Sequence, residues 1–427
     1  MLYGECVRKN RLLRCIHQWY WRSIREDLWY QWRLIPILRI RYFLRLREVR
    51  KIYGMRKLRV AFPVSNLAKW KEQSIYDAML ASDKFEPFVV LTPMDIESEK
   101  SHEEKCAIIA GNKEFFVSMG MRVEVAYDMQ KGVCLPFSVY SPDIVWYTQP
   151  WKIDQVQMPQ QVSKFALTCY TPYFVQNYGG LDLDCGPRFH RHLWRHFTLN
   201  ERWAKVFMEY QGFRRAGRVV GLGHPMLDVI KPVKHKTNDT KVIIYAPHWS
   251  CNTGECFSTF LDTGRRVLRF AQAHTSVQWV FKPHPTLRLT LKKNCGWSDS
   301  DISEYYSAWE KLGVSCYDGK YVELFSGSTC MLTDCASFLV EYVCTGNPII
   351  HLISPSAKYK PHPIAQELFD TYYQVRNCDE LEFVLKQIGV EGFDPKREDR
   401  IVAVKRMRLI DNNAAENIIK YIEEIFE

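Results

Sequence analysis

The chain alternates between short apolar runs and longer helical patterns, and this alternation restricts its fold more than any other feature. The runs are short, rich in β-branched and aromatic residues, and bounded by turn residues, as strands are. They lie at residues 58–62, 88–91, 123–125, 143–147, 218–220, 241–246, 277–281, 330–332 and 349–352. Strands that alternate with helices pair in parallel, so the pattern predicts an α/β fold built from βαβ units.

With 427 residues the chain is long enough for two such domains. Residues 231–240 are polar and lack periodic apolar positions, which is typical of a linker. We therefore expect the chain to divide into a basic, aromatic helical segment, two α/β domains with parallel sheets, and closing helices. These parts are residues 1–57, 58–230, 241–400 and 401–427.

Polar side chains follow three successive strands of the second half. His248 follows the run 241–246, Lys282 and His284 follow 277–281, and Asp334 and Ser337 follow 330–332. In an open parallel sheet, ligands bind outside the carboxyl ends of the strands, where the strand order reverses. A helix is expected to begin near Ser337, and the free N–H groups of a helix N-terminus bind phosphate. The spacing predicts a crevice for a nucleotide diphosphate.

The dipeptide His-Pro occurs three times, at His224, His284 and His362, and such a pair is often no more than a turn. The context of His284 differs, because a strand-like run precedes it and Lys282 stands two residues before it. We expect a ligand contact at His284. A purely structural role is favoured for His224 and His362.

Four side chains of the first half also lie past strand ends, namely Gln149, Trp151, Tyr170 and Tyr173. They could line the acceptor side of a cleft. They could equally be packing residues in a chain that is rich in tryptophan and tyrosine, and the sequence leaves both alternatives open.

Several kinds of cofactor have no support in the sequence. Neither a G-x-G-x-x-G nor a G-x-x-x-x-G-K-[ST] motif is present, so dinucleotide cofactors and P-loop chemistry are not expected. The 14 cysteines include no Cys-x-x-Cys pair and no Cys/His zinc spacing, so we expect no disulfide and no structural metal. Without a long apolar run or a signal peptide, the chain is expected to stay in the cytoplasm.

Positive charge is concentrated at the N-terminus. Residues 1–57 contain 15 Lys and Arg against 4 Asp and Glu, a surplus of 11, whereas the whole chain carries a net charge of +10. The same segment contains Trp19, Trp21, Trp29 and Trp32. Basic helices rich in aromatic residues lie on anionic membrane surfaces, which is our expectation here. The alternatives are a helical appendage packed on its own domain, or binding to nucleic acid, for which the near-neutral remainder supplies no second basic face.

Several motifs of the second half resemble those of the CDP-glycerol glycerophosphotransferases, the teichoic-acid and capsule enzymes of bacteria. The motifs are YAPHW at 245–249, FKPHP at 281–285 and LTDCASFLVE at 332–341. Residues 221–228 and 413–419 are also similar, so the resemblance covers roughly residues 218–427.

The resemblance implies a GT-B architecture, two Rossmann-like domains with a cleft between them. Residues 58–230 would be the N-terminal domain that binds the acceptor, and residues 241–400 the C-terminal domain that binds the nucleotide donor. The resemblance also implies that His284 contacts the donor diphosphate and Ser337 a phosphate, and that Asp334 and Glu341 shape the site. The family's Trp-His-Gly motif, whose histidine is its proposed base, is absent here, and one of its paired serines is replaced by Ala336. The acceptor, the base and the transferred group therefore stay open.

These features predict a transferase at the cytoplasmic face of a bacterial membrane. It would move a polyol phosphate from a CDP-activated donor to a hydroxyl of a membrane-associated surface glycan, and it would need no cofactor beyond the donor. His284, Lys282 and Ser337 would stabilise the charge of the leaving diphosphate, and His248 would act as a base or as a second phosphate contact. The alternatives are a GT-B glycosyltransferase using a CMP- or UDP-sugar in capsule or lipopolysaccharide synthesis, and a non-catalytic GT-B-like binding protein.

Overall fold

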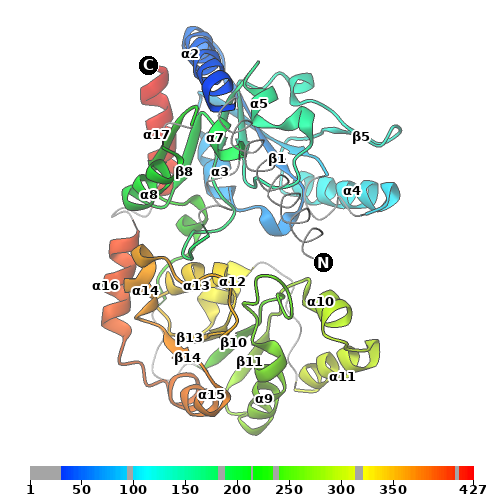
Figure 1. The fold of residues 1–427 in the computed structure, drawn as a ribbon, viewed down its shortest axis with the longest axis vertical. Coiled ribbons are helices and arrows are strands. Elements are labelled where there is room, and N and C mark those ends of the chain that lie inside the picture. The colour runs from blue at the N-terminus through cyan, green and yellow to red at the C-terminus, as the bar shows by residue number, and fades with distance from the viewer. Residues whose placement is uncertain are drawn as a thin grey trace, which may run out of the picture.

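The computed structural model describes residues 30–93, 100–180, 188–212, 215–233, 240–312, 321–408 and 413–427. Most of the basic segment (1–29) and the middle of the expected linker (234–239) lie outside these ranges. The described residues form two α/β units, one above the other in Figure 1.

The first unit is built on a sheet of seven parallel strands. Their spatial order is β3 (Val123–Val125), β2 (Phe85–Leu91), β1 (Leu58–Val64), β6 (Ile144–Tyr147), β7 (Leu167–Tyr170), β8 (Arg195–Thr198) and β9 (Arg218–Gly221). A short hairpin of β4 (Tyr127–Asp128) and β5 (Val133–Cys134) stands apart from it. The chain proceeds outward from β1 on both sides, so the strand order reverses between β1 and β6.

The second unit has five parallel strands. Their order is β11 (Gln278–Phe281), β10 (Val242–Ala246), β12 (Cys330–Thr333), β13 (Ile349–Leu352) and β14 (Tyr373–Val375), and the reversal lies between β10 and β12. The predicted α/β class with two parallel sheets is thus confirmed. Strands β8 and β14 were not predicted, because their sequences RHFT and YQV offer no apolar run.

Helices flank both sheets. Those of the first unit are α2 (Ile35–Ile52), α3 (Gln73–Ala81), α4 (His102–Ser118), α5 (Pro159–Val162), α7 (Arg188–His192) and α8 (Glu201–Gln211). Those of the second are α9 (Phe260–Ala273), α10 (Leu287–Asn294), α11 (Asp299–Glu310), α12 (Tyr321–Gly327), α13 (Ala336–Val343), α14 (Gln366–Phe369) and α15 (Cys378–Val384), and the chain closes with α16 (Arg397–Met407) and α17 (Ala414–Phe426). Short helical turns include η2 (Leu67–Lys69) and η6 (Pro225–Val229).

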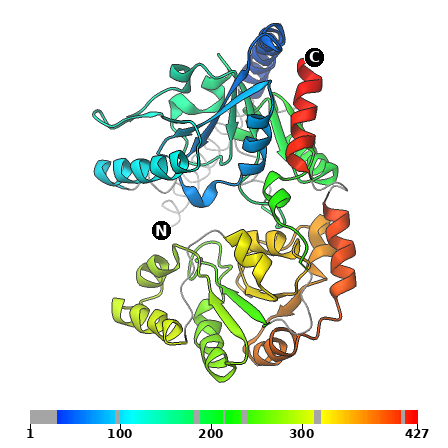
Figure 2. The same ribbon diagram turned by 180° about the vertical axis from the view of Figure 1, so that it is seen from behind.

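The two closing helices do not form a part of their own. Helix α16 packs on the second unit, whereas α17 returns to the first and buries Ile418, Ile422 and Phe426 in its core. Both views show α17 beside the upper unit (Figures 1 and 2). Asp228, at the end of the first unit, accepts the N–H groups of Ala414 and Ala415 at 2.8 and 2.9 Å and so caps α17.

Helix α2 is also part of the first unit. It buries Ile35, Leu38, Tyr42 and Val49 in the same core as the central strands. The Tyr42 hydroxyl donates a hydrogen bond to the carbonyl of His192 at 2.5 Å. The inner face of α2 therefore matches the alternative in which the basic segment is a helical appendage packed on its own domain.

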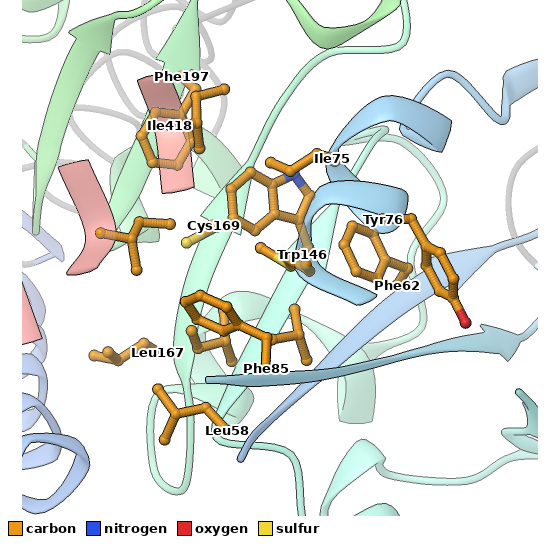
Figure 3. Packing of buried hydrophobic residues seen from close by; sticks show 14 of the residues in the cluster. Leu58, Phe62, Ile75, Tyr76, Phe85, Trp146, Leu167, Cys169, Phe197 and Ile418 are labelled. Atoms are coloured by element: carbon orange, nitrogen blue, oxygen red, sulfur yellow. The ribbon is translucent and has the colours of Figure 1, made fainter. Parts of the chain in front are cut away.

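The core of the first unit joins segments that are distant in sequence. Trp146 of β6 stacks on Phe197 of β8 with ring centroids 5.2 Å apart, and Ile418 of α17 and Phe62 of β1 lie around them (Figure 3). This packing holds the central strands in register, and it positions the loops at their carboxyl ends.

Candidate functional site

Asp334 organises the loops at the reversal point of the second sheet. Its carboxylate accepts the N–H of His248 at 2.5 Å on one oxygen, and the N–H and hydroxyl of Thr259 at 2.6 and 3.0 Å on the other. The side chain is buried, and burial raises its pKa to about 6, against the lowering effect of these donors. Because protein donors contact both of its oxygens, Asp334 holds these loops together.

The imidazoles of His248 and His284 lie side by side at this reversal point, with ring centroids 5.6 Å apart. The His284 N–H also donates to the carbonyl of Pro247 at 3.0 Å, which ties the loop after β11 to the loop after β10. The expectation that these strand ends converge is confirmed by this geometry.

Hydrogen bonds assign the same tautomer to both imidazoles. Nδ1 of His248 accepts the backbone N–H of Ser250 at 3.3 Å, and Nδ1 of His284 accepts the backbone N–H of Thr286 at 3.2 Å. The hydroxyl of the same serine or threonine lies 2.8 Å from each Nδ1 and can therefore donate to it. The proton of each neutral ring is therefore on Nε2. Burial lowers the pKa of His248 to about 3, with a contribution from His284, and burial together with Lys282 lowers that of His284 to about 4. At neutral pH both rings are uncharged and present an N–H donor.

The three His-Pro dipeptides form the same local turn. In each, Nδ1 of the histidine accepts the N–H two residues further on, at 3.4 Å for His224, 3.2 Å for His284 and 3.2 Å for His362. Their surroundings differ: His224 is buried and donates through Nε2 to the carbonyl of Pro172 at 2.7 Å, whereas the ring of His362 lies 4.8 Å from that of Trp203. Among the three, His284 alone lies beside a second imidazole.

Helix α13 begins directly after the Asp334 loop. Ser337 lies in its first turn and is partly exposed, with its hydroxyl 3.3 Å from the thiol of Cys335. The carbonyl of Ala336 accepts a hydrogen bond from the side chain of Asn177 at 2.7 Å. A segment of the first unit therefore contacts the start of this helix.

A buried cluster of charged and polar side chains joins the two units beside α13. Lys71 comes from the loop before α3, and its ammonium lies 3.9 Å from the carboxylate of Glu341 and donates to the hydroxyl of Tyr321. Lys282 lies over the same tyrosine ring at 6.0 Å. Burial raises the pKa of Glu341, against the attraction of Lys71 and Lys282, and raises that of the adjacent Glu72 to about 8.

This cluster contains residues that sequence reasoning missed. Helix α3 begins at Gln73, and residues 70–72 form the loop that carries Lys71 and Glu72 to the other unit. One oxygen of Glu72 and one of Glu341 are buried without a hydrogen-bond partner among the described residues. No local pattern in the sequence marked Lys71 or Glu72, because their role depends on the docking of the two units, whereas Glu341 was expected from the family resemblance.

The first sheet has its own polar pair at its reversal point. Ser65 directly follows β1, and Gln149 lies two residues after the end of the neighbouring strand β6. Both are buried, and the Ser65 hydroxyl and the Gln149 amide nitrogen have no hydrogen-bond partner among the described residues. A buried polar group without a partner is costly, so each of these two groups needs a water molecule or a ligand as its partner.

Aromatic side chains lie beside this pair. Trp151 packs edge-on against Tyr173 at 5.8 Å and stacks on Phe174 at 6.3 Å, and the ammonium of Lys69 lies 5.4 Å from the Tyr173 ring. These side chains are partly exposed. Tyr170 is different, because it is buried against Phe189, His190 and His196 inside the first unit, which is the packing alternative that the sequence left open.

Among the described residues, no group of three or more His, Cys, Asp or Glu side chains is arranged so that it could hold a metal ion. Among the same residues, no helix is both long and apolar enough to cross a membrane.

No protein-family model matches the chain, and no curated protein matches it in sequence. Its structure is similar to solved structures. The UDP-GlcNAc 2-epimerase from Neisseria meningitidis bound to UDP-GlcNAc matches with a TM-score of 0.55 and 12% identity, over 86% of this chain and 100% of that one. The S. aureus MnaA–UDP co-structure matches with a TM-score of 0.50 and 15% identity, over 86% and 96% of the two chains.

At such identities the likeness establishes the fold alone. The chain has the GT-B fold, two Rossmann-like α/β domains, as expected from the sequence. Neither a family model nor a curated sequence supports the CDP-glycerol family, so that resemblance rests on the motif residues.

Proposed function

We propose that this protein is a GT-B transferase that binds the diphosphate of a nucleotide-activated donor at the reversal point between β10 and β12. The observation that carries the proposal is the pair of neutral imidazoles, His248 and His284, each with its proton on Nε2 and 5.6 Å apart. Preorganised N–H donors stabilise charge that develops on a leaving phosphate, and they need no reorganisation during the reaction. Ser337 and the first N–H groups of α13 would add further donors.

The motif resemblance favours a CDP-linked polyol phosphate, of the glycerol phosphate kind, as the donor. An acceptor hydroxyl would attack the phosphorus of the polyol phosphate, and the bond to the nucleoside monophosphate would break, so that CMP leaves with the added negative charge. His248 is better suited to a second phosphate contact than to a base, because its Nδ1 already accepts hydrogen bonds and its Nε2 carries a proton. The acceptor proton must go to a group outside this pair.

Lys71, Lys282 and Glu341 would act next to the donor. They belong to the buried cluster at α13, where Glu341 lies one helical turn after Ser337 and the other two residues are lysines. Because Lys71 belongs to the first domain, it would couple donor binding to the closure of the two domains. The pair of Ser65 and Gln149, with the aromatic side chains beside it, would bind the acceptor.

A second candidate is a transferase or epimerase reaction on a nucleotide sugar. The observation that favours it is the shared fold, since the solved structures named above contain UDP or UDP-GlcNAc. The partly exposed Trp151 also offers a flat face on which a sugar ring could stack.

A donor screen tests both candidates. The purified protein is heated with CDP-glycerol, CDP-ribitol, a CMP-sugar or UDP-GlcNAc, because a ligand that binds only the folded state raises the melting temperature. Donors that raise it are then assayed for release of CMP, UDP or an epimerised sugar. CMP release from CDP-glycerol supports the first proposal. If a donor raises the melting temperature but no product forms with any acceptor, the chain is a binding protein. If no nucleotide raises the melting temperature, both candidates are contradicted.

The proposal includes work at a membrane surface. The outer face of α2 exposes Ile37, Ile40, Phe43 and Leu44 next to basic residues, with exposed fractions between 44% and 60%. A helix of this composition fits the boundary of an anionic bilayer. Deletion of residues 1–57 would also remove the core contacts of α2, so point substitutions on its outer face are the better test.

A further inference from the structure

A basic cavity lies between α2 and the starts of strands β8 and β9. Its volume is about 330 Å³, and four arginines line it, namely Arg39, Arg195, Arg215 and Arg218. Of the described residues that line it, none is acidic. Arg195 and Arg218 are the first residues of their strands, so the cavity lies at the amino ends of β8 and β9. The polar residues Ser65 and Gln149 follow the opposite, carboxyl ends of strands in the same sheet.

Neutral groups hold two of these arginines in place. Arg195 lies 4.2 Å over the ring of Trp194 and donates to the hydroxyl of Tyr421 at 2.9 Å, and Arg215 donates to the carbonyl of Met208 at 3.2 Å. These contacts fix the guanidinium groups of Arg195 and Arg215 but do not neutralise them. Arg39 is tied to the same cavity, because it donates two hydrogen bonds to the carbonyl of Arg215, at 3.1 and 3.0 Å.

Mutual repulsion contributes to the lowered pKa of two of these arginines. Burial lowers the pKa of Arg215, and the charges of Arg39 and Arg218 lower it further. Burial also lowers the pKa of Arg195, and Arg218 again contributes. A cavity whose described lining contains several cations and no carboxylate attracts an anion, and a guanidinium group can bind two phosphate oxygens at once.

The other walls of the cavity are apolar. Tyr42, Phe43 and Leu46 of α2 and Trp194 of the loop before β8 complete the lining. Phe43 also belongs to the exposed face of α2, where it is 60% exposed, and Ile40 and Leu44 continue that face along the helix. In both ribbon views α2 lies at the end of the molecule that is remote from the second domain (Figures 1 and 2). A ligand with a phosphate group and an apolar chain would match both parts of this surface.

We propose that this cavity binds the phosphate group of an anionic membrane lipid, whose acyl chains lie against the exposed apolar face of α2. The site is separate from the proposed donor site, and it does not depend on the reaction of the protein. It would orient α2 toward the bilayer and hold the second domain away from it.

The test uses the full-length protein and vesicles of phosphatidylcholine with or without phosphatidylglycerol. In the variant Arg215→Gln/Arg218→Gln two cavity charges are removed, and Arg218→Gln alone serves where Arg215 is needed for folding, because Arg218 is exposed. The matched control is Arg266→Gln/Arg269→Gln, which removes the same charge from α9 in the other domain. Circular dichroism and melting temperature establish that each variant is folded.

Tight binding to phosphatidylglycerol vesicles is expected for the natural protein and the control. The cavity variants should bind roughly tenfold more weakly or worse, because basic groups at an anionic surface each contribute severalfold to the affinity. Equal binding of the cavity and control variants would show that general basicity attracts the protein, and absence of binding by the natural protein would equally overturn the proposal.

A second measurement separates a lipid from free phosphate. Soluble dihexanoyl-phosphatidylglycerol, below its micelle concentration, should raise the melting temperature of the natural protein but not of the cavity variants. Inorganic phosphate at the same concentration should raise it less. If inorganic phosphate is as effective as the short-chain lipid, the cavity is a site for free phosphate and the lipid assignment is wrong.

Discussion

The carboxylate of Asp334 accepts the backbone N–H of His248 at 2.5 Å, and this bond ties the loop after β12 to the loop after β10. These two strands are neighbours at the reversal point of the second sheet, so the bond closes the base of the proposed donor site. The family resemblance implied a role for Asp334 in shaping the site, and the contact explains how it does so: it holds the backbone, and through it the imidazole of His248.

Replacement of Asp334 by asparagine should destabilise the protein. An asparagine would direct its amide N–H₂ at either His248 or the N–H and hydroxyl of Thr259, so that donors would face donors. We expect Asp334→Asn to lower the free energy of unfolding by about 1.5–3 kcal/mol, the usual worth of hydrogen bonds to a charged group, as measured by urea denaturation. Asp299→Asn is the control, because that carboxylate is exposed. Equal stability of the two variants would refute the assigned role.

His284→Ala should strongly reduce turnover without unfolding the protein. If Nε2–H of His284 contacts the diphosphate, turnover should fall roughly 10²-fold or more, with a nearly unchanged melting temperature. His362→Ala is a matched control, because its Nδ1 makes the same bond of 3.2 Å to the N–H two residues further on. Similar activities of the two variants, measured by nucleotide release, would remove His284 from the site.

Lys71 and Glu341 should be energetically coupled across the domain boundary. Each side chain is buried, so removal of one leaves an uncompensated group, which costs about 3–5 kcal/mol in buried pairs. We expect Lys71→Met and Glu341→Gln each to lower the unfolding free energy strongly, and the double variant to lose much less than their sum. The exposed pair of Arg406 and Glu367 should show a coupling of about 1 kcal/mol or less in the same double-mutant cycle. Additive losses at Lys71 and Glu341 would contradict a direct interaction.

Stability should fall when the pH falls below about 6.5, the ordinary pKa of histidine. Burial lowers the pKa of His196 to about 3, so below pH 6.5 the unfolded chain takes up a proton that the folded protein does not. The free energy of unfolding therefore decreases as the pH falls from about 6.5 toward 3. His196→Phe should reduce this slope by up to about 1.4 kcal/mol per pH unit, seen as a smaller loss of melting temperature between pH 7 and 5. An unchanged slope would show that His196 does not contribute.

Gly221, one of the residues that carry the family resemblance, should tolerate no side chain. A Cβ at this position would lie 2.0 Å from the carbonyl carbon of Asn200, which is backbone and cannot move aside. We expect Gly221→Ala to lower the melting temperature sharply or to prevent folding. Gly254→Ala is the control, because no atom lies within 4 Å of its Cβ position. A well-folded Gly221→Ala protein would contradict this account of the motif.

Sequence alone determined the class of fold and the position of the strand ends. Short apolar runs are local, so the strands near residues 58, 123, 242, 278 and 349 could be predicted from their own residues. The parallel pairing followed from the helices between them, and it brought the predicted His248, His284 and Asp334 to one edge of the second sheet. Two strands with polar sequences, β8 and β14, were not predicted, because pairing with neighbouring strands, and not a local apolar run, makes these segments extended.

Contacts between distant segments required the tertiary structure. The three His-Pro turns have the same local hydrogen bond, and only their surroundings show that His224 is buried, that His362 packs on Trp203 and that His284 faces His248. The buried pairing of Lys71 with Glu341 likewise depends on the docking of the two domains, because these residues are 270 positions apart in the chain. Burial and charge pairing are properties of the folded surroundings, so the sequence supplied the groups and the tertiary structure decided which of them meet.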